Sequence, residues 1–235
     1  MNELKAAVLA GGAGTRLSPI TNYIPKCMIP IGGKPFLAYV FTFLRRHGIR
    51  DIVMLVSPED ADIYRNEFRS GEAVHMNIEY SIHPRKGTAQ AVYDARKLLD
   101  SSFVVYYGDV LTDLNLTNMI RFHKSKKAHC TLALSRSVPI DYGVGKINRT
   151  GRVVYFEEKP VLKEYPVSMG IHIFEPIVLD YCISSQDIAR EVIPQLIKKH
   201  LRVFGYSTNK RHHDLGSFKH LNEIKMMIEK KGNTI

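Results

Sequence analysis

Residues 8–16 read VLAGGAGTR and follow an apolar segment. Backbone N–H groups left free in such a glycine loop can surround phosphate oxygens, because glycine lets the main chain approach a ligand without a Cβ between them. Arg16 ends the loop, and Lys26 follows ten residues later. These two cations add positive charge that a loop of neutral residues lacks. The segment therefore predicts a site for a phosphorylated ligand.

Three other interpretations of this loop have less support. A P-loop requires Gly-Lys followed by Ser or Thr, and neither Thr15-Arg16 nor Gly33-Lys34-Pro35 supplies that pattern. A dinucleotide fingerprint requires glycine where Leu17 stands, and only Glu59, in the place of a ribose-binding acid, favours it. A tight turn that binds nothing would not need three glycines together with two cations.

Further short motifs follow along the chain. They are Lys34-Pro35, Gly87-Thr88-Ala89, Gly108-Asp109, Tyr142-Gly143-Val144, Glu158-Lys159-Pro160, Gly170-Ile171 and Asp214-Leu215-Gly216. Together with residues 9–17 and Pro25-Lys26, they resemble, in order, the motifs of the sugar-1-phosphate nucleotidylyltransferases, also called NDP-sugar pyrophosphorylases. The resemblance implies Mg²⁺-dependent transfer of a nucleotidyl group from an NTP to a sugar 1-phosphate, with release of pyrophosphate.

The resemblance also implies catalysis by cations in place of proton transfer. The attacking phosphate is already largely ionised, because the second pKa of a phosphate monoester is about 6. Arg16 is expected at the β- and γ-phosphates, Lys26 at the α-phosphate and the attacking phosphate, and Lys159 at the phosphate of the sugar. Their charge would offset the repulsion between two anions and the charge that builds on pyrophosphate.

Other contacts are expected with the nucleotide and with the sugar. The nucleotide-binding residues are expected to be Leu9, Ala10, Gly11, Gly12, Gly14, Thr15, His83, Gly87 and Thr88. The sugar-binding residues are expected to be Tyr142, Gly143, Glu158, Ser168 and Gly170.

Asp109 and Asp214 are the expected ligands of Mg²⁺. Asp109 ends a predicted strand, where open α/β sheets bind ligands, and Mg²⁺ needs few protein ligands beside phosphate oxygens. The alternative is that Asp109 caps a turn and Asp214 caps the helix from Ser217. Zinc is disfavoured, because the adjacent His212 and His213 cannot easily face one ion and no third soft ligand is near.

The chain departs from the family pattern at positions that contact the base and the sugar. Ser168 or Met169 stands where relatives often have Asn, His172 replaces a tyrosine, and His83 stands where Gln or Glu is common. The substrates therefore stay open. Mannose 1-phosphate with GTP is the leading expectation, followed by glucose 1-phosphate with UTP or dTTP, and guanylyl transfer to heptose 1-phosphate also suits the chain.

Strands and helices alternate in the first half of the chain. Apolar runs and helical spacing predict strands at Leu4–Leu9, Asp51–Val56, Ile78–Ile82, Phe103–Tyr107 and Cys130–Arg136, and helices at Phe36–His47, Glu59–Arg69, Thr88–Leu99 and Asn118–Lys126. This alternation indicates an α/β fold with a doubly wound, mostly parallel sheet, which the resemblance makes a Rossmann-like nucleotidyltransferase fold.

After about residue 140 the pattern changes to short strands. They are expected at Val144–Asn148, Val153–Glu157 and Val167–Phe174, with residues 148–151 as a hairpin turn, and helices at Asp187–Lys199 and Ser217–Lys230 enclose a strand at Arg202–Tyr206. We interpret this half as sugar-binding insertions. The expectation is one domain over residues 1–235, with a nucleotide-binding half (about 1–137), a sugar-phosphate half (about 138–235) and no C-terminal β-helix.

Composition bounds the class of protein. Apolar residues make up 45% and charged residues 24%, as in globular proteins, and no apolar run approaches the ~20 residues of a membrane helix. The first residues lead directly into a strand, so no signal peptide is expected. Cys27, Cys130 and Cys182 lie far apart and are interpreted as buried hydrophobes in a reducing cytoplasm.

The net charge of +10 favours an anionic partner. An NTP and a sugar 1-phosphate are sufficient anionic partners, so neither nucleic acid nor a membrane is expected. A homo-oligomer is possible, but no sequence feature indicates one. The first alternative is a regulatory module that binds nucleotide or sugar phosphate without turnover, against which the complete set of charged motif residues argues. Nucleic-acid binding comes third, because the lysine clusters lie at predicted helix ends, where cations suit the helix dipole.

Overall fold

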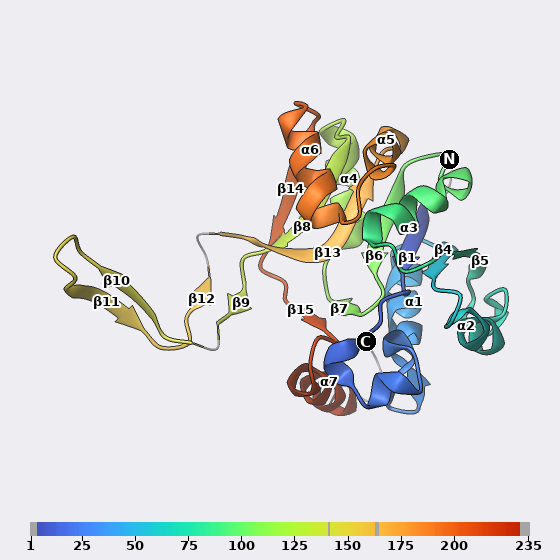
Figure 1. Cartoon of the computed structure of the whole chain (residues 1–235), viewed down its shortest axis with the longest axis horizontal. Coiled ribbons are helices and arrows are strands. Elements are labelled where there is room, and N and C mark those ends of the chain that lie inside the picture. The colour runs from blue at the N-terminus through green and yellow to red at the C-terminus, as the bar shows by residue number, and fades with distance from the viewer. Residues whose placement is uncertain (1–3, 141, 163–164, 231–235) are drawn as a thin grey trace.

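A seven-stranded sheet runs through the centre of the molecule, with helices on both of its faces (Figure 1). The computed structural model describes residues 4–140, 142–162 and 165–230. In spatial order the strands are β14 (Val203–Thr208), β8 (Cys130–Ser135), β13 (Val167–Phe174), β6 (Phe103–Tyr107), β1 (Lys5–Leu9), β4 (Asp51–Val56) and β5 (Asn77–Ile82). The predicted doubly wound α/β fold is confirmed.

The sheet is parallel except at β13. Strand β1 runs parallel to β4 and β6, β4 parallel to β5, and β14 parallel to β8, whereas β13 is antiparallel to both β6 and β8. Its register shifts between Ser168 and His172 on the β8 side. The alternation of strands and helices did not predict this direction. The described residues between β8 and β13 form only short strands and no crossover helix, which a parallel connection would need.

Two hydrophobic cores lie on opposite faces of the sheet, and side chains of β1 enter them alternately. Ala6 and Val8 pack into the core that contains α1 (Phe36–Arg46), α2 (Ala61–Phe68), α4 (Leu116–Ser125) and α7 (Phe218–Lys230). Ala7 packs into the other core, which contains α3 (Thr88–Asp94), α5 (Leu179–Cys182) and α6 (Ile193–Lys198). Burial on both faces explains why β1 reads as an almost continuous apolar run.

Two predicted helices differ from the observed elements. The helix expected over Thr88–Leu99 ends at Asp94 and continues as a 3₁₀ turn, Arg96–Leu98. The helix expected over Asp187–Lys199 is a π-helical turn, Ile188–Val192, followed by α6. Pro194 lies in the first turn of α6 and has no N–H to donate, which interrupts the regular ladder there. None of the helices in the described part of the chain is both long and apolar enough to span a bilayer.

Three pairs of short strands lie outside the central sheet and were not predicted. They are β2 (Pro30–Ile31) with β3 (Lys34–Pro35), β9 (Val138–Pro139) with β12 (Val161–Leu162), and β7 (Val110–Thr112) with β15 (His212–Asp214). The last pair joins the two halves of the chain, because β7 directly follows β6 whereas β15 directly precedes α7.

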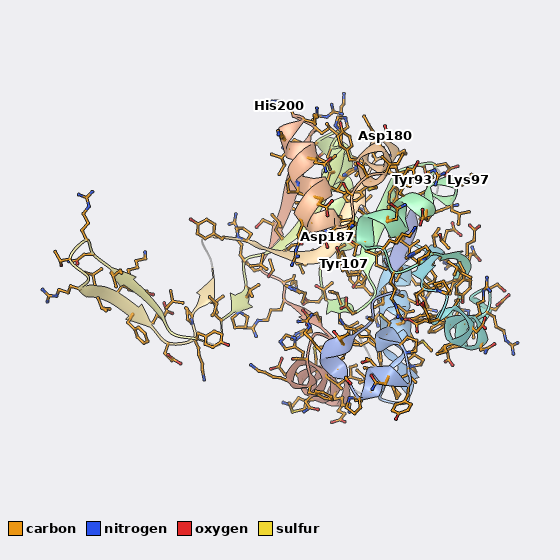
Figure 2. All side chains as sticks on the ribbon, in the orientation of Figure 1. Tyr93, Lys97, Tyr107, Asp180, Asp187 and His200 are labelled. Carbon is orange, nitrogen blue, oxygen red and sulfur yellow. The ribbon has the colours of Figure 1, made fainter. Side chains whose placement is uncertain are left out.

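A two-stranded hairpin extends away from the sheet (Figure 1). It consists of β10 (Val144–Ile147) and β11 (Val153–Glu157), joined by the predicted turn, in which the Asn148 N–H donates to the Arg152 carbonyl. Its side chains project from both faces into solvent (Figure 2), and Ile147 and Phe156 are 70% and 64% exposed. Three of the residues expected to bind the sugar, Tyr142, Gly143 and Glu158, therefore lie next to an arm with exposed apolar side chains that stands away from the main body.

The three cysteines are free and buried, as expected from their spacing. Burial raises the pKa of Cys27 and of Cys182 to about 12 and also raises the pKa of Cys130. Because the thiolate is the reactive form, we expect the native protein at pH 8 to react with a disulfide reagent such as DTNB roughly 10²-fold more slowly than the unfolded chain. Unfolding in guanidinium should then release all three thiols, and rapid reaction of the native protein would contradict this account.

Candidate active site

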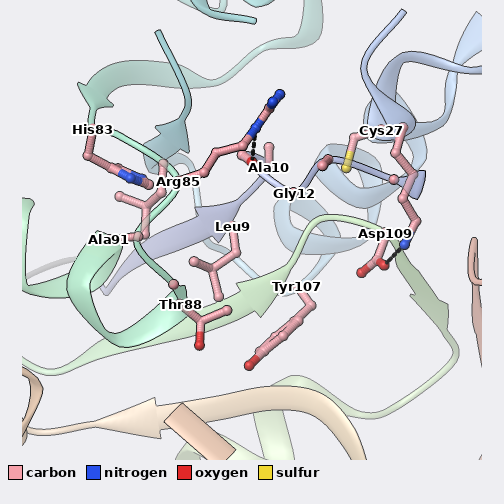
Figure 3. Close-up of a pocket in the computed structure, with 16 residues that line it drawn as sticks. Leu9, Ala10, Gly12, Cys27, His83, Arg85, Thr88, Ala91, Tyr107 and Asp109 are labelled. Carbon is pink, nitrogen blue, oxygen red and sulfur yellow. Dashed lines mark hydrogen bonds and ion pairs between the residues drawn. The ribbon is translucent and has the colours of Figure 1, made fainter. Parts of the chain in front are cut away.

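A cavity of about 380 Å³ opens at the carboxyl ends of β1 and β6. Its volume lies in the range of small-molecule sites. Figure 3 shows the glycine loop between two polar ends, with His83 and Arg85 at one end and Asp109 at the other. The expected nucleotide contacts among its lining residues are Leu9, Ala10, Gly11, Gly12, Gly14, His83, Gly87 and Thr88. Thr15 is not among them; it begins the short helical turn that follows the loop.

Gly14 is the point at which the loop turns back toward Lys26. Its φ is +63°, and an added Cβ would lie 2.8 Å from Thr21 Cγ2 and 3.1 Å from Lys26 Cβ. The Thr21 hydroxyl donates to the Gly14 carbonyl at 3.0 Å. Leu17, which stands at the third glycine position of a dinucleotide fingerprint, is fully buried in the core. Position 14 therefore requires glycine, and the third glycine of a dinucleotide fingerprint is absent.

Lys26 and Asp109 form an ion pair at the edge of the cavity (Figure 3). The Lys26 side chain is 14% exposed and that of Asp109 is 23% exposed, so both are partly shielded from water. Asp109 follows β6, and Lys26 lies in a 3₁₀ turn, Lys26–Met28, after Pro25. A lysine held by a carboxylate in this way is positioned before any ligand arrives.

The pairing of β7 with β15 brings Asp214 to Asp109. Asp214 is in register with Val110, and the Leu215 N–H donates to the Asp109 carbonyl at 2.9 Å. Arg16 lies at the same place, since a Cβ added to Gly216 would be 3.5 Å from Arg16 Nη1 and 2.5 Å from Asp214 Oδ1. Two carboxylates and two cations, distant in sequence, thus gather beside the cavity, and two of them, Lys26 and Asp109, line it.

Asp214 accepts two hydrogen bonds on its Oδ1 atom, one from the Gly216 N–H at 2.8 Å and one from His220 Nδ1 at 2.7 Å. Burial works to raise the pKa of Asp214, but the hydrogen bond and charge of His220, the Gly216 N–H and the charge of Lys26 outweigh it and lower that pKa. Asp214 is therefore held as a carboxylate. The cap of α7 is supplied by Ser217, whose hydroxyl accepts from the His220 N–H at 3.3 Å.

The donors present suit Mg²⁺ better than zinc. Asp109, which directly precedes β7, and Asp214, at the end of β15, offer hard carboxylate oxygens, and Mg²⁺ is commonly held by one or two carboxylates together with substrate phosphates. Burial lowers the pKa of both His212 and His213. In the described ranges, no group of three His, Cys, Asp or Glu side chains is gathered as a metal-binding cluster.

His83 presents a defined face to the cavity. Its Nδ1 lies 3.0 Å from the Pro84 carbonyl oxygen, which can only accept, so Nδ1 carries a proton. Its Nε2 is buried, with no hydrogen-bond partner among the residues that the structure describes. In the neutral ring, Nε2 is an acceptor.

The residues expected to bind the sugar fall into two groups. Gly143 and Glu158 lie together at the neck of the hairpin, where a Cβ on Gly143 would be 2.8 Å from Glu158 Oε2. Tyr142 and Lys159 are next to them in sequence, both exposed, and none of these four residues lines the cavity. In the second group, Gly170 lies at the site, since a Cβ there would be 3.3 Å from the Tyr107 ring, and the Ser168 hydroxyl accepts from the Gly170 N–H at 3.4 Å.

Sequence reasoning missed Arg85 and Tyr107. Arg85 Nε donates to the Gly11 carbonyl at 3.0 Å and its Nη2 to Asp60 Oδ2 at 2.6 Å, which ties the glycine loop to the segment before α2. Tyr107 lies at the end of β6 on the same side as Asp187 (Figure 2), and burial raises its pKa to about 12. Neither residue carries a local signal, because an isolated Arg or Tyr in a loop or strand end is ordinary.

Comparison with known proteins decides the family. The family model described as nucleotidyl transferase matches residues 5–231, nearly the whole chain. This chain belongs to the nucleotidyl transferase family. The resemblance stated from the motifs is therefore confirmed.

Three relatives share about a third of their aligned residues with this family member. A UTP–glucose-1-phosphate uridylyltransferase of Synechocystis is 33% identical over 91% of this chain and 60% of its own length. A mannose-1-phosphate guanylyltransferase of Mycobacterium tuberculosis is 33% identical over 92% and 62%. A D-glycero-α-D-manno-heptose 1-phosphate guanylyltransferase of Campylobacter jejuni is 31% identical over 83% and 87%. The chain thus spans about three fifths of the first two relatives.

The fold also matches that of a solved structure. The structure of HddC from Yersinia pseudotuberculosis, complexed with GMP-PN, has a TM-score of 0.74 and 24% identity, covering 96% of this chain and 99% of that one. At this identity the similarity shows the shared fold.

Proposed function

We propose that this nucleotidyl transferase family member converts an NTP and a sugar 1-phosphate to an NDP-sugar and pyrophosphate. The observation that carries the proposal is the convergence of Arg16, Lys26, Asp109 and Asp214 beside the glycine-loop cavity. The three relatives above are named for this class of reaction, and they support the same conclusion.

In the proposed reaction, an oxygen of the sugar phosphate attacks the α-phosphorus of the NTP, and the bond to the β-phosphate breaks. In this proposal Lys26 neutralises the α-phosphate and the incoming phosphate, and Arg16 holds the departing pyrophosphate in its planar fork. Asp109 and Asp214 would hold Mg²⁺, which supplies further positive charge to the phosphates when bound. Catalysis then rests on alignment and charge.

Lys159 is our proposed contact to the sugar phosphate, and the neck of the hairpin, with Tyr142, Gly143 and Glu158, is the proposed sugar side of the site. These residues adjoin the strands β9 and β12, which connect the hairpin to the main sheet. Gly170 and Ser168 lie on β13 at the register shift with β8, and Gly170 lies close against the Tyr107 side chain. The sugar would lie between these two groups.

A direct assay tests this proposal. The protein is incubated with Mg²⁺, each of GTP, UTP, dTTP, ATP and CTP, and the 1-phosphates of mannose, glucose and a heptose, and pyrophosphate release is measured. Release from at least one pair, dependent on both substrates, is expected. Absence of release from every pair, with folded protein that still binds an NTP, would favour the regulatory module instead.

We further propose GTP, or UTP and dTTP, as the nucleotide. His83 lines the cavity, and its Nε2 is a buried acceptor that has no partner among the described residues. Guanine presents N1–H, and uracil and thymine present N3–H, on the edge that such a pocket reads, whereas adenine and cytosine present an acceptor nitrogen at the equivalent ring position. Mannose 1-phosphate with GTP stays our first choice, with glucose 1-phosphate and UTP or dTTP second.

The substitution His83→Leu is expected to lower kcat/KM for the preferred NTP about tenfold, which corresponds to the ~1.4 kcal/mol of one hydrogen bond. The base lies away from the reacting phosphorus, so most of the loss should come as a higher KM for the NTP. Steady-state kinetics with each substrate varied in turn measures this, and the KM for the sugar phosphate serves as the internal control. An unchanged KM for every NTP would remove His83 from the base site.

A further inference from the structure

His220 contacts Asp214 from the start of α7. The two hydrogen bonds described above, from His220 Nδ1 and from the Gly216 N–H, both fall on Oδ1 of Asp214. A carboxylate can only accept, so Nδ1 of His220 carries the proton and donates. This arrangement fixes one oxygen of the carboxylate and leaves Oδ2 for a cation.

The helix that carries His220 is rigidly anchored. His220 is the third residue of α7, and its backbone N–H is capped by Ser217. Leu221, Ile224 and Ile228 are buried in the same core as β1, which sets the rotation of the helix about its axis. The imidazole is thus presented from a fixed element, whereas Asp214 ends a strand of three residues.

Neighbouring groups restrict the orientation of the Asp214 carboxylate. The close approach of Gly216 to Oδ1 means that any side chain at position 216 would collide with Asp214 or displace it. Arg16 lies beyond Gly216, and Lys26 lies close enough to lower the pKa of Asp214. His220 is therefore one of two donors that set the orientation of the carboxylate, and it is the one that a substitution can remove.

We propose that His220 is a positioning residue, which orients Asp214 so that its second oxygen faces the divalent cation of the active site. This inference rests on the proposed function for the identity of that cation. Hydrogen-bond partners of metal ligands typically change metal affinity or activity by 10–100-fold when they are removed. His220 acts through Asp214 and needs no contact with either substrate.

The test compares three variants of the full chain. His220→Ala removes the donor, and His220→Asn keeps a side-chain N–H near the position of Nδ1. Glu223→Gln is the control, because Glu223 lines a second cavity together with Asp214 and His220. Binding of Mn²⁺–pyrophosphate is measured by water-proton relaxation, the melting temperature by calorimetry, and turnover as a function of Mg²⁺ concentration.

We expect His220→Ala to weaken Mn²⁺–pyrophosphate binding and raise the half-saturating Mg²⁺ concentration by about 10–100-fold, and His220→Asn by less than about threefold. Glu223→Gln should match the wild type, and Tm should stay within about 2 °C for all three, because His220 is 42% exposed. Wild-type binding by His220→Ala, equal loss in the alanine and asparagine variants together with a lowered Tm, or no metal binding by the wild type would each overturn the proposal.

The proposed function can fail independently of this inference. If the wild type binds Mn²⁺–pyrophosphate and the variants respond as expected, but no NTP and sugar phosphate pair yields pyrophosphate, then His220 still positions Asp214 and the proposed reaction is wrong. If turnover occurs and His220→Ala leaves the metal dependence unchanged, the reaction stands and the positioning role falls.

Discussion

Replacing Lys26 with alanine is expected to lower kcat about 10²–10³-fold, the usual effect of removing one charge contact from a transition state. Lys26 is held by Asp109 beside the glycine loop and is mostly shielded from solvent. Its charge is therefore positioned before the phosphates arrive and costs little reorganisation when the new bond forms. The rate of pyrophosphate release at saturating substrates measures the effect.

Two further variants test whether the effect is specific to Lys26. Lys26→Arg keeps the charge but replaces a compact ammonium by a planar fork, so we expect an intermediate rate. Lys97→Ala removes an exposed lysine in the 3₁₀ turn after α3 (Figure 2) and should leave the rate unchanged. A Lys26→Ala protein with more than half of the wild-type turnover would exclude Lys26 from the mechanism.

Asp109→Ala is expected to lower kcat by about 10³-fold, because it removes a proposed ligand of Mg²⁺ and also releases Lys26 from its partner. The residual activity should require a higher Mg²⁺ concentration than the wild type does. Pyrophosphate release measured over a range of Mg²⁺ concentrations, with EDTA-treated wild type as the metal-free reference, reports both effects.

Asp113→Ala is the matched control for Asp109. Asp113 lies four residues further along, is 60% exposed and pairs with Lys210 on the surface, so its loss should change kcat little. Because Lys26 and Asp109 touch, the double alanine variant should lose little more than the worse of the two single variants. Fully multiplicative losses, or an Asp109→Ala protein with an unchanged Mg²⁺ requirement, would contradict the shared site.

The glycine loop and Asp109 could be predicted from local sequence patterns, because interactions between residues close in sequence form this part of the candidate site. A strand buried on both faces has a continuous apolar sequence, and the glycine loop must follow it, so Leu9 and Gly14 could be located without a structure. Asp109 could be located in the same way, since ligands gather at the carboxyl ends of parallel strands. The boundary of α3 could not, because neither Gly nor Pro marks its end after Asp94.

The rest of the site depends on contacts between distant segments. Strands β7 and β15 have three residues each, too few for a periodic signal, and nothing near His212 indicates its pairing with Thr112. Arg85 reaches across to Gly11 from 74 positions away. The antiparallel direction of β13 and the extension of the hairpin away from the sheet likewise depend on tertiary contacts. Both determine the position of Lys159.

The ladder between β7 and β15 has a consequence for biogenesis. Asp109 and Asp214 are separated by more than a hundred positions, so a chain emerging from the ribosome can assemble the glycine loop and bury β1 long before the second carboxylate exists. Under the proposed function, the pair of carboxylates is then complete only once β15 has paired with β7. A nascent or clipped molecule that lacks β15 and α7 would keep the glycine loop but lack Asp214, and the proposed function predicts that it would be inactive.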